Sequence, residues 1–491
     1  MTRDPRPTLL WLRRDLRLAD NPALTAAARG GSPVIPIFID DEPRMGGAAR
    51  WWRGRSLAAL RQAFAELGSR LIIRQGVALD QIMSLAQETG AGSLHFNRRF
   101  EPRGLTADAQ IVTELRGSGI EVHEHHGNRL HEPWSLKTLK GEPFRVFTPF
   151  WRRLAENYRA PERCAAPTAL THPRAWPASL DISALQIAAP WSAGMTTQWR
   201  PGEAGALALL ERLPAKIPDY GASRDRPDVE GTSRLSPHLA WGDISVHEIW
   251  RRLAADTPPA SNGFLRELGW RDFNTHLLYH FPRLPVQNWN TRFDAFPFRQ
   301  APEDFAAWCK GRTGFPIVDA GMRELWTTGW MHNRVRMIVA SFLIKDLLID
   351  WRDGEKWFWD TLVDADLAQN AGNWQWVAGS GADAAPYFRI FNPTTQSAKF
   401  DPDGIYIRRW LPELARLPRT FIHDPASAPD DVLLNAGVKL GRTYPYPIVD
   451  HAAARGRALA IYKALGSADP GGASSAESMH KAASRQRNLF S

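Results

Sequence analysis

Cysteine is scarce in this sequence of 491 residues, where Cys164 and Cys309 are the only two. Two cysteines cannot supply a disulfide framework, a four-cysteine cluster or a cysteine-based zinc site, so a reducing cytoplasm is expected. No apolar run approaches the roughly 20 residues that a membrane helix requires. Near the start, Pro5 and Pro7 stand among charged residues where a signal peptide would need an apolar core. These absences exclude membrane-spanning and disulfide-rich classes.

A glycine-rich turn is also missing after the first apolar run, which is followed by Arg13-Arg14-Asp15. This disfavours an NAD-type enzyme. Hydrophobic residues at 44%, charged residues at 23% and a mean hydropathy of −0.35 are typical of a globular protein. The formal charge of +9 favours a polyanionic partner. Tryptophan is abundant, with 21 residues, which indicates either packing or aromatic chemistry.

Five short apolar runs at the start of the chain alternate with segments of helical spacing. The runs are residues 8–15, Val34–Asp40, Leu71–Gly76, Ser93–Arg99 and Glu121–His126. The helical segments are Asn21–Arg29, Ala48–Leu67, Val77–Thr89 and Thr106–Ser118. This alternation predicts a doubly wound parallel sheet in an α/β domain.

The rest of the chain divides by composition. We expect the α/β domain to occupy residues 1–130, and a connector rich in Pro and Trp to follow over 131–195. Residues 196–466 have helical spacing almost throughout and predict an all-α domain, whereas the small polar residues of 467–491 predict a disordered tail. The apolar stretch Val335–Trp351 predicts one buried central helix.

The segment from Tyr220 to Pro237 has no hydrophobic periodicity but concentrates hydroxyl groups and backbone donors ahead of a helix expected near Pro237. Such groups beside a helix start suit a phosphate. An ordinary capped loop is the alternative, and this segment alone does not decide between them.

A helix is predicted over 263–280, where Glu267, Trp270, Arg271 and Asn274 share one face. Together these side chains suit a planar, polar, anionic ligand, with Trp for stacking and Arg for phosphate. The alternative is a solvated helix face that carries one Trp.

Arg334 and Arg336 point to different sides of a second predicted helix. One can therefore reach outward to a phosphate while the other is buried against a carboxylate, for which Asp364 and Asp366 are candidates. The Gly, Asn and Trp density of residues 370–393 indicates backbone bent around a ligand, and a Gly-rich loop with core tryptophans is the alternative.

Several long motifs resemble the photolyase/cryptochrome family, specifically its cyclobutane pyrimidine dimer photolyases. The motifs include TLLWLRRDLRLADNPAL, EGTSRLSPHLAWGDIS, ELGWRDFNTHLLYH and DADLAQNAGNWQWVAGSGADAAPYFRIFNP, and the similarity runs in order over residues 8–465. The connector and residues 51–60 look closest to the third class of these enzymes. The resemblance implies an antenna domain, a helical FAD-binding domain, and light-driven splitting of pyrimidine dimers in DNA.

The resemblance implies the positions that hold FAD. They are Tyr220, Thr232, Ser233, Arg234, Leu235, Ser236, Phe264, Arg336, Asp364, Ala365, Asp366 and Asn370. Within this set, Arg336 resembles the arginine that pairs with Asp364, and Asn370 the residue that faces flavin N5. An uncharged amide there suits a fully reduced flavin as electron donor.

The resemblance also implies the substrate side, where ultraviolet-damaged DNA presents a flipped pyrimidine dimer. The cavity residues are Glu267, Trp270, Asn333 and Met337, and the other implied DNA contacts are Arg224, Arg271, Asn274, Arg334, Arg389 and Gln396. The (6-4) photolyases place two histidines in this cavity. Here His332 is followed by Asn333 and Met337, which favours dimer repair.

Trp374 and Trp351 resemble the inner two members of the tryptophan chain that photoreduces FAD, whereas Phe298 replaces the solvent-side member. The solvent-side end of this electron-transfer route is therefore left open, and the candidates are Trp357, Trp359, Trp376, Trp289 or a tyrosine.

Glu101 resembles the antenna contact, and the resemblance favours 5,10-methenyltetrahydrofolate, with 8-hydroxy-deazaflavin as the alternative. No metal is expected, and we expect a cytoplasmic monomer acting on DNA. The alternatives are a cryptochrome-type photoreceptor without repair and a single-strand-preferring photolyase like cryptochrome DASH.

Overall fold

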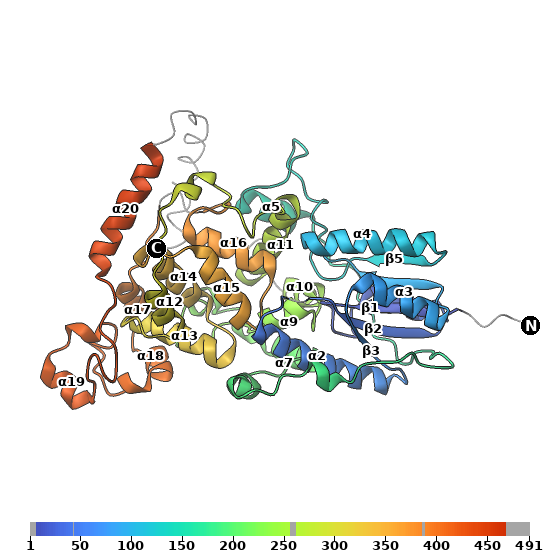
Figure 1. The fold of residues 1–491 in the computed structure, drawn as a ribbon, viewed down its shortest axis with the longest axis horizontal. Helices are drawn as coiled ribbons and strands as arrows, with labels where there is room; N and C mark the ends of the chain where they lie inside the picture. Colours follow the sequence, from blue (N-terminus) through green and yellow to red (C-terminus); the bar gives the residue numbers. More distant parts are fainter. Residues whose placement is uncertain (1–5, 43, 256–261, 385–387, 468–491) are drawn as a thin grey trace, which may run out of the picture.

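The computed structural model of the protein describes residues 6–42, 44–255, 262–384 and 388–467. An α/β region and a larger helical region lie side by side, with the sheet at the right of Figure 1 and helix α20 at the left. Within the described ranges, no helix is both long and apolar enough to span a bilayer. The predicted tail lies outside these ranges apart from its first residue.

The α/β region contains one five-stranded parallel sheet in the order β3-β2-β1-β4-β5. The strands are β1 (Thr8–Leu12), β2 (Val34–Asp40), β3 (Ile72–Gln75), β4 (Ser93–Asn97) and β5 (Glu121–His125). In register, Thr8 of β1 lies opposite Val34 on one side and Ser93 on the other. All five predicted strands and the doubly wound parallel sheet are confirmed.

Helices cover both faces of this sheet because alternate strand residues point to opposite sides. The helices are α1 (Pro22–Arg29), α2 (Gly47–Glu66), α3 (Ala78–Thr89) and α4 (Pro102–Gly117). Leu10 and Leu12 share a core with α1 and α2, whereas Leu9 and Trp11 share a separate core with α3 and α4. The carboxyl end of β1 meets the helical region, where the Leu16 N–H donates to the Trp241 carbonyl at 3.2 Å.

After β5 the chain forms the predicted connector and then the predicted helical region. The connector holds α5 (Phe147–Asn157) and two short 3-10 turns. The helices that follow are α6 (Ala193–Gln198), α7 (Glu203–Arg212), α8 (Tyr220–Ser223), α9 (Ser236–Trp241), α10 (Val246–Ala254), α11 (Gly263–His280), α12 (Pro302–Cys309), α13 (Pro316–Thr328), α14 (Asn333–Ser341), α15 (Trp351–Thr361), α16 (Leu367–Ala378), α17 (Pro393–Phe400), α18 (Ile405–Trp410), α19 (Asp430–Ala436) and α20 (His451–Ser467). The predicted helix over 263–280 is confirmed at both ends. The residue boundaries of the domains stay a prediction.

The single helix predicted over Val335–Trp351 is wrong, although the stretch is buried as expected. Helix α14 passes into a π-helical turn at Phe342–Asp346, and α15 begins only at Trp351. Leu348 adopts φ +53°, which a right-handed helix cannot contain. Asp350 then caps α15, because its side chain accepts a hydrogen bond from the Arg352 N–H at 3.0 Å. The apolar pattern predicted burial but gave no signal of the break.

Candidate cofactor and DNA-binding site

The loop that leads to α9 brings its polar groups against the interior of the helical region. Ser236 starts α9, and its hydroxyl donates to Asp364 Oδ2 at 2.6 Å. Arg234 has φ +56°, and its guanidinium lies between the rings of Trp199 and Trp330, 4.7 Å from each centroid. Such a stacked cation fixes the loop that contains the predicted phosphate and ribose contacts.

Five further predicted cofactor residues lie in or around this loop. The Thr232 carbonyl accepts a hydrogen bond from Lys216 Nζ at 2.9 Å, and the Ser233 hydroxyl accepts one from the Leu235 N–H at 3.2 Å. Leu235 is buried. Tyr220, also buried, packs edge-on against Phe264 with ring centroids 5.4 Å apart. The loop is therefore held by its own hydrogen bonds and by aromatic packing.

The stretch Asp364–Asp366 contains two buried carboxylates. Arg336 is half-buried and donates to Asp364 Oδ2 at 2.8 Å, so the predicted pair with this carboxylate is confirmed. The other oxygen, Asp364 Oδ1, is buried and accepts no hydrogen bond from any residue that the structure describes. A buried acceptor without a donor fits a ligand that carries an N–H or O–H group, as FAD does. The residues present therefore fit the cofactor that the sequence implies.

Asn370 lies on α16, one turn beyond this stretch, and is buried. Its Nδ2 donates to Glu355 Oε1 at 2.8 Å and to the Glu355 carbonyl at 3.0 Å. Burial raises the pKa of Glu355 to about 7. Glu355 on α15 is a neighbour that sequence reasoning missed, since the two residues are 15 positions apart on different helices.

Trp374 and Trp351, the predicted inner tryptophans, lie on the adjoining helices α16 and α15 and are buried. Gly354, one turn after Trp351, receives the Trp374 ring so closely that a Cβ there would lie 2.2 Å from it. Trp308, which sequence reasoning missed, packs edge-on against Trp374 at 6.3 Å between ring centroids. Phe298 packs against Phe296 at 4.8 Å.

The alternative exits that the sequence left open lie in different surroundings. Trp357 stacks on the exposed Trp326 with ring centroids 6.0 Å apart, and Trp289 packs edge-on against Phe281 at 4.5 Å. The Trp359 and Trp376 indoles donate to backbone carbonyls. Which of these residues forms the solvent-side end of the electron-transfer route stays a prediction.

A chain of half-exposed ion pairs connects the starts of α11 and α14. Glu267 Oε1 accepts a hydrogen bond from Arg224 at 2.6 Å, and Arg334 donates to Asp225 Oδ2 at 2.7 Å. Arg224 Nε lies 4.0 Å from Asp225 Oδ1, which joins the two pairs. We call these four residues the outer ion-pair chain. It places two predicted DNA-binding arginines beside Glu267.

Predicted cavity residues flank this chain. The Trp270 ring stacks flat on Phe147, with centroids 3.6 Å apart and planes within 10°. Asn333 is exposed at the start of α14, and Met337 is half-buried one turn later. Burial lowers the pKa of the preceding His332 to about 4, so this ring is neutral at physiological pH. It caps α14 by accepting a hydrogen bond from the Arg334 N–H at 3.2 Å.

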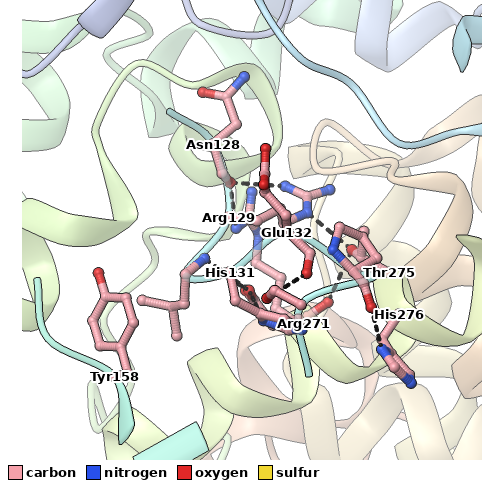
Figure 2. A network of polar contacts seen from close by, with 12 residues as sticks. Asn128, Arg129, His131, Glu132, Tyr158, Arg271, Thr275 and His276 are labelled. Carbon is pink, nitrogen blue, oxygen red and sulfur yellow. Dashed lines mark hydrogen bonds and ion pairs between the residues drawn. The ribbon is translucent and has the colours of Figure 1, made fainter. Parts of the chain in front are cut away.

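The structure turns two predicted DNA contacts inward. Arg271 donates to the carbonyls of Asn128 and Leu239, each at 3.0 Å, and burial lowers its pKa to about 9. Asn274 is buried and donates to Gln369 at 2.9 Å. The helix pattern put both on the same face as Glu267, but the segment after β5 lies against α11 at Arg271 (Figure 2), and α16 lies against it at Asn274. Arg271 and Asn274 therefore hold the interior together.

Two further predicted DNA contacts lie beyond α16. Gln396 is half-buried on α17. Arg389 is half-buried, and its carbonyl accepts a hydrogen bond from the buried Lys345. Both stay predictions.

A small pocket lies at the carboxyl ends of β1 and β2, which is where ligands bind in open parallel sheets. It is lined by Arg13, Arg14, Phe38, Ile39, Asp41, Glu42, Met45, Arg53, Arg99 and Trp241. Burial alone would lower the pKa of Arg14 and of Arg99. The nearby carboxylates, which include Glu101, outweigh this effect and raise both pKa values. Glu101, the predicted antenna contact, therefore lies near this pocket. The arginines that line the pocket were not predicted from the sequence.

The protein has a parallel α/β domain beside a helical domain. It also has a buried site suited to a cofactor and arginines near the surface. These features define a two-domain cofactor-binding protein. Residues 8–170 match the family model described as DNA photolyase, and residues 264–464 match the FAD binding domain of DNA photolyase.

The chain is 50% identical to the deoxyribodipyrimidine photo-lyase of Agrobacterium fabrum over 94% of its length and 98% of that protein. It is 40% identical to cryptochrome-2 of Arabidopsis thaliana over 91% of its length and 77% of that protein. Its fold superimposes on a bacterial class III photolyase from Agrobacterium tumefaciens with a TM-score of 0.92, covering 95% of this chain and 99% of that one. The chain belongs to the photolyase/cryptochrome family.

Proposed function

We propose that this protein is a deoxyribodipyrimidine photo-lyase, which splits cyclobutane pyrimidine dimers in DNA when illuminated. The observation that carries the proposal is the two-sided character of α14. Arg336 pairs with the buried Asp364 on the cofactor stretch, and Arg334 pairs with the half-exposed Asp225 in the outer ion-pair chain. Helix α14 thus separates the cofactor from a polyanionic substrate. The two lie close together across it, as electron transfer requires.

When bound in its reduced form, FAD supplies on illumination the electron that opens the cyclobutane ring. The residues of the chain hold this cofactor and its surroundings. Arg336 balances the charge of Asp364, and Asp364 Oδ1 is the free acceptor for a cofactor donor. Asn370, held by Glu355, presents a neutral amide beside them.

The residues that would bind the substrate lie on the side of α14 opposite to the cofactor stretch. Glu267 and Arg224 would exchange their mutual hydrogen bond for contacts with a base edge and a phosphate, because half-exposed ion pairs contribute little free energy. A flipped base can stack on Trp270 only on the face opposite Phe147. Extrusion of a dimer, which is already poorly paired, costs about a few kcal/mol.

The pocket at the sheet edge is the proposed antenna site, with Glu101 beside it. Its arginines suit the anionic groups of 5,10-methenyltetrahydrofolate, and 8-hydroxy-deazaflavin is the alternative. Near-ultraviolet absorption of the purified protein tests the assignment. A band released on mild denaturation that matches neither pterin nor deazaflavin would contradict it. A monomer in the cytoplasm that acts on chromosomal DNA completes the proposal.

Light-dependent loss of cyclobutane dimers from ultraviolet-irradiated duplex DNA, with pre-reduced protein and a dark control, tests the function. We expect repair in the light only. Repair confined to single-stranded DNA would assign the protein to the single-strand-preferring group. FAD binding without repair of either substrate would favour a photoreceptor, a possibility raised by the 40% identity with a cryptochrome.

A further inference from the structure

Each residue of the stretch Asp364–Asp366 is held by a different arginine. Arg336 donates to Asp364 at 2.8 Å, Arg14 donates to the Ala365 carbonyl at 3.1 Å, and Arg129 donates to Asp366 Oδ2 at 2.9 Å. We call these three side chains the arginine clamp. Two of its members lie outside the helical domain, since Arg14 follows β1 and Arg129 follows β5.

Arg129 and Asp366 form a pair with side chains only 10% and 8% exposed. Arg129 Nε also donates to Thr275 on α11 at 2.9 Å, so the guanidinium cannot turn freely (Figure 2). Burial would raise the pKa of Asp366, but the guanidinium groups of Arg129 and Arg271 outweigh it and hold that pKa below its usual value. Asp366 is therefore a charged group in a fixed position.

The second oxygen of Asp366 starts helix α16. Asp366 Oδ1 accepts hydrogen bonds from the N–H groups of Ala368 at 3.0 Å and Gln369 at 3.1 Å. One carboxylate thus connects Arg129, in the segment after β5, to the helix that carries Asn370 and Trp374. A shift of Arg129 would be transmitted to both of these residues.

Arg14 makes the same kind of connection from the sheet. Its NH2 donates to Glu42 at 3.1 Å in the α/β domain, while its NH1 reaches Ala365 in the helical domain. The guanidinium also lies over the Trp241 ring, 4.7 Å from its centroid. The planar guanidinium holds two partners at once from two separate nitrogens in a fixed geometry, whereas a lysine would have to donate to both from one nitrogen.

We propose that Arg14 and Arg129 are positioning residues of the FAD site, through which the α/β domain holds the cofactor stretch in place. The inference rests on the proposed function only in placing FAD along residues 364–366. Removing Arg129 leaves a buried charge without its partner, so it should weaken FAD binding about 10-fold. Removing Arg14 frees only a carbonyl and should weaken it about 3-fold.

The test is a titration of the apoprotein with FAD, together with the visible spectrum of the bound cofactor. We expect Arg129→Met to weaken binding and to alter the spectrum, and Arg129→Lys to restore part of the affinity. Arg251→Met is the matched control, because Arg251 on α10 pairs with Asp20 of the α/β domain at 2.6 Å without contacting residues 364–366. It should lower thermal stability and leave the FAD dissociation constant unchanged.

A loss of stability in Arg129→Met with wild-type affinity and spectrum would overturn the inference. So would an Arg251→Met variant that weakens FAD binding equally. If Arg129→Met does not fold, Asp366→Asn removes the charge but keeps the oxygen that caps α16, and it should also weaken FAD binding. Failure of the wild-type protein to bind FAD would instead contradict the proposed function, so the two failures are distinct.

Discussion

The arginine clamp and the outer ion-pair chain both join arginines to carboxylates, but they differ in burial and in the origin of the partners. The carboxylates of the clamp, Asp364 and Asp366, are 4% and 8% exposed, whereas Glu267 and Asp225 of the outer chain are 32% and 31% exposed. A buried pair is held because each charge would be costly alone, while an exposed pair contributes little and exchanges partners readily.

This difference separates two tasks within a short distance of each other. A cofactor that stays bound requires fixed partners, and the arginines of the clamp come from the segment after β1, the segment after β5 and α14. A substrate that binds and leaves requires partners that can be released. The outer chain consists of such residues. Changes in the clamp should therefore affect FAD binding, and changes in the outer chain should affect DNA repair.

The largest effect is expected from Arg336→Met. Asp364 would keep only the Ser236 hydroxyl as a partner. Breaking a buried pair from one side costs about 3 kcal/mol, which corresponds to ~100-fold weaker FAD binding. Titration of the apoprotein measures it. Arg334→Met, two residues away on the same helix, is the control and should bind FAD nearly as well as the wild type. Equal losses in the two variants would remove the distinction between clamp and outer chain.

Trp374→Phe separates cofactor binding from electron supply. The ring lies in the closely packed site beside Gly354, and phenylalanine preserves most of that packing. We expect photoreduction of oxidised FAD to slow sharply, while pre-reduced protein repairs dimers at a near-normal rate. Absorption changes under illumination measure the first quantity, and dimer loss measures the second. Equal loss of both would show that Trp374 has another role.

Glu267→Gln tests the outer chain. The amide keeps the shape of the side chain but loses the charge that pairs with Arg224 and that would bind a base edge. We expect light-driven repair to fall by ~10-fold, as for loss of one charged hydrogen bond. Stability should change by less than about 1 kcal/mol. An unchanged repair rate in a single-turnover assay would exclude Glu267 from the substrate site.

The smallest effect concerns Glu355. Burial raises its pKa to about 7, so the folded protein binds this proton more tightly than the unfolded chain does. Its contribution therefore favours folding at low pH and is lost as the pH rises through 7. We expect Glu355→Gln to be more stable than the wild type by about 1 kcal/mol at pH 8 and no more stable at pH 4. Urea unfolding at the two pH values measures the difference, and equal differences at both would contradict the assignment.

Local patterns in the sequence predicted the strands of the sheet and helix α11 of the site, but not the break between α14 and α15. Apolar runs gave the five strands, and helical spacing gave α11 from Gly263 to His280. The same spacing predicted that Arg336 and Arg334 point to opposite sides, and the pair between Arg336 and Asp364 is confirmed.

Contacts between residues far apart in the sequence could not be predicted from such local patterns. Arg14 and Ala365 are 351 residues apart, and Arg129 and Asp366 are 237 apart. Periodicity also could not show that Arg271 is turned toward the carbonyls of Asn128 and Leu239. The break at Leu348 was missed because a leucine carries no signal for positive φ.

The most direct test of this account is to measure FAD affinity and dimer repair for Arg336→Met and Glu267→Gln in one experiment. Repair is assayed with FAD in excess, so that the site of each variant is filled. The account predicts that Arg336→Met loses FAD affinity far more than it loses repair when filled, and that Glu267→Gln loses repair while its FAD affinity is unchanged. Parallel losses of both quantities in both variants would contradict the division between an inner cofactor site and an outer DNA site.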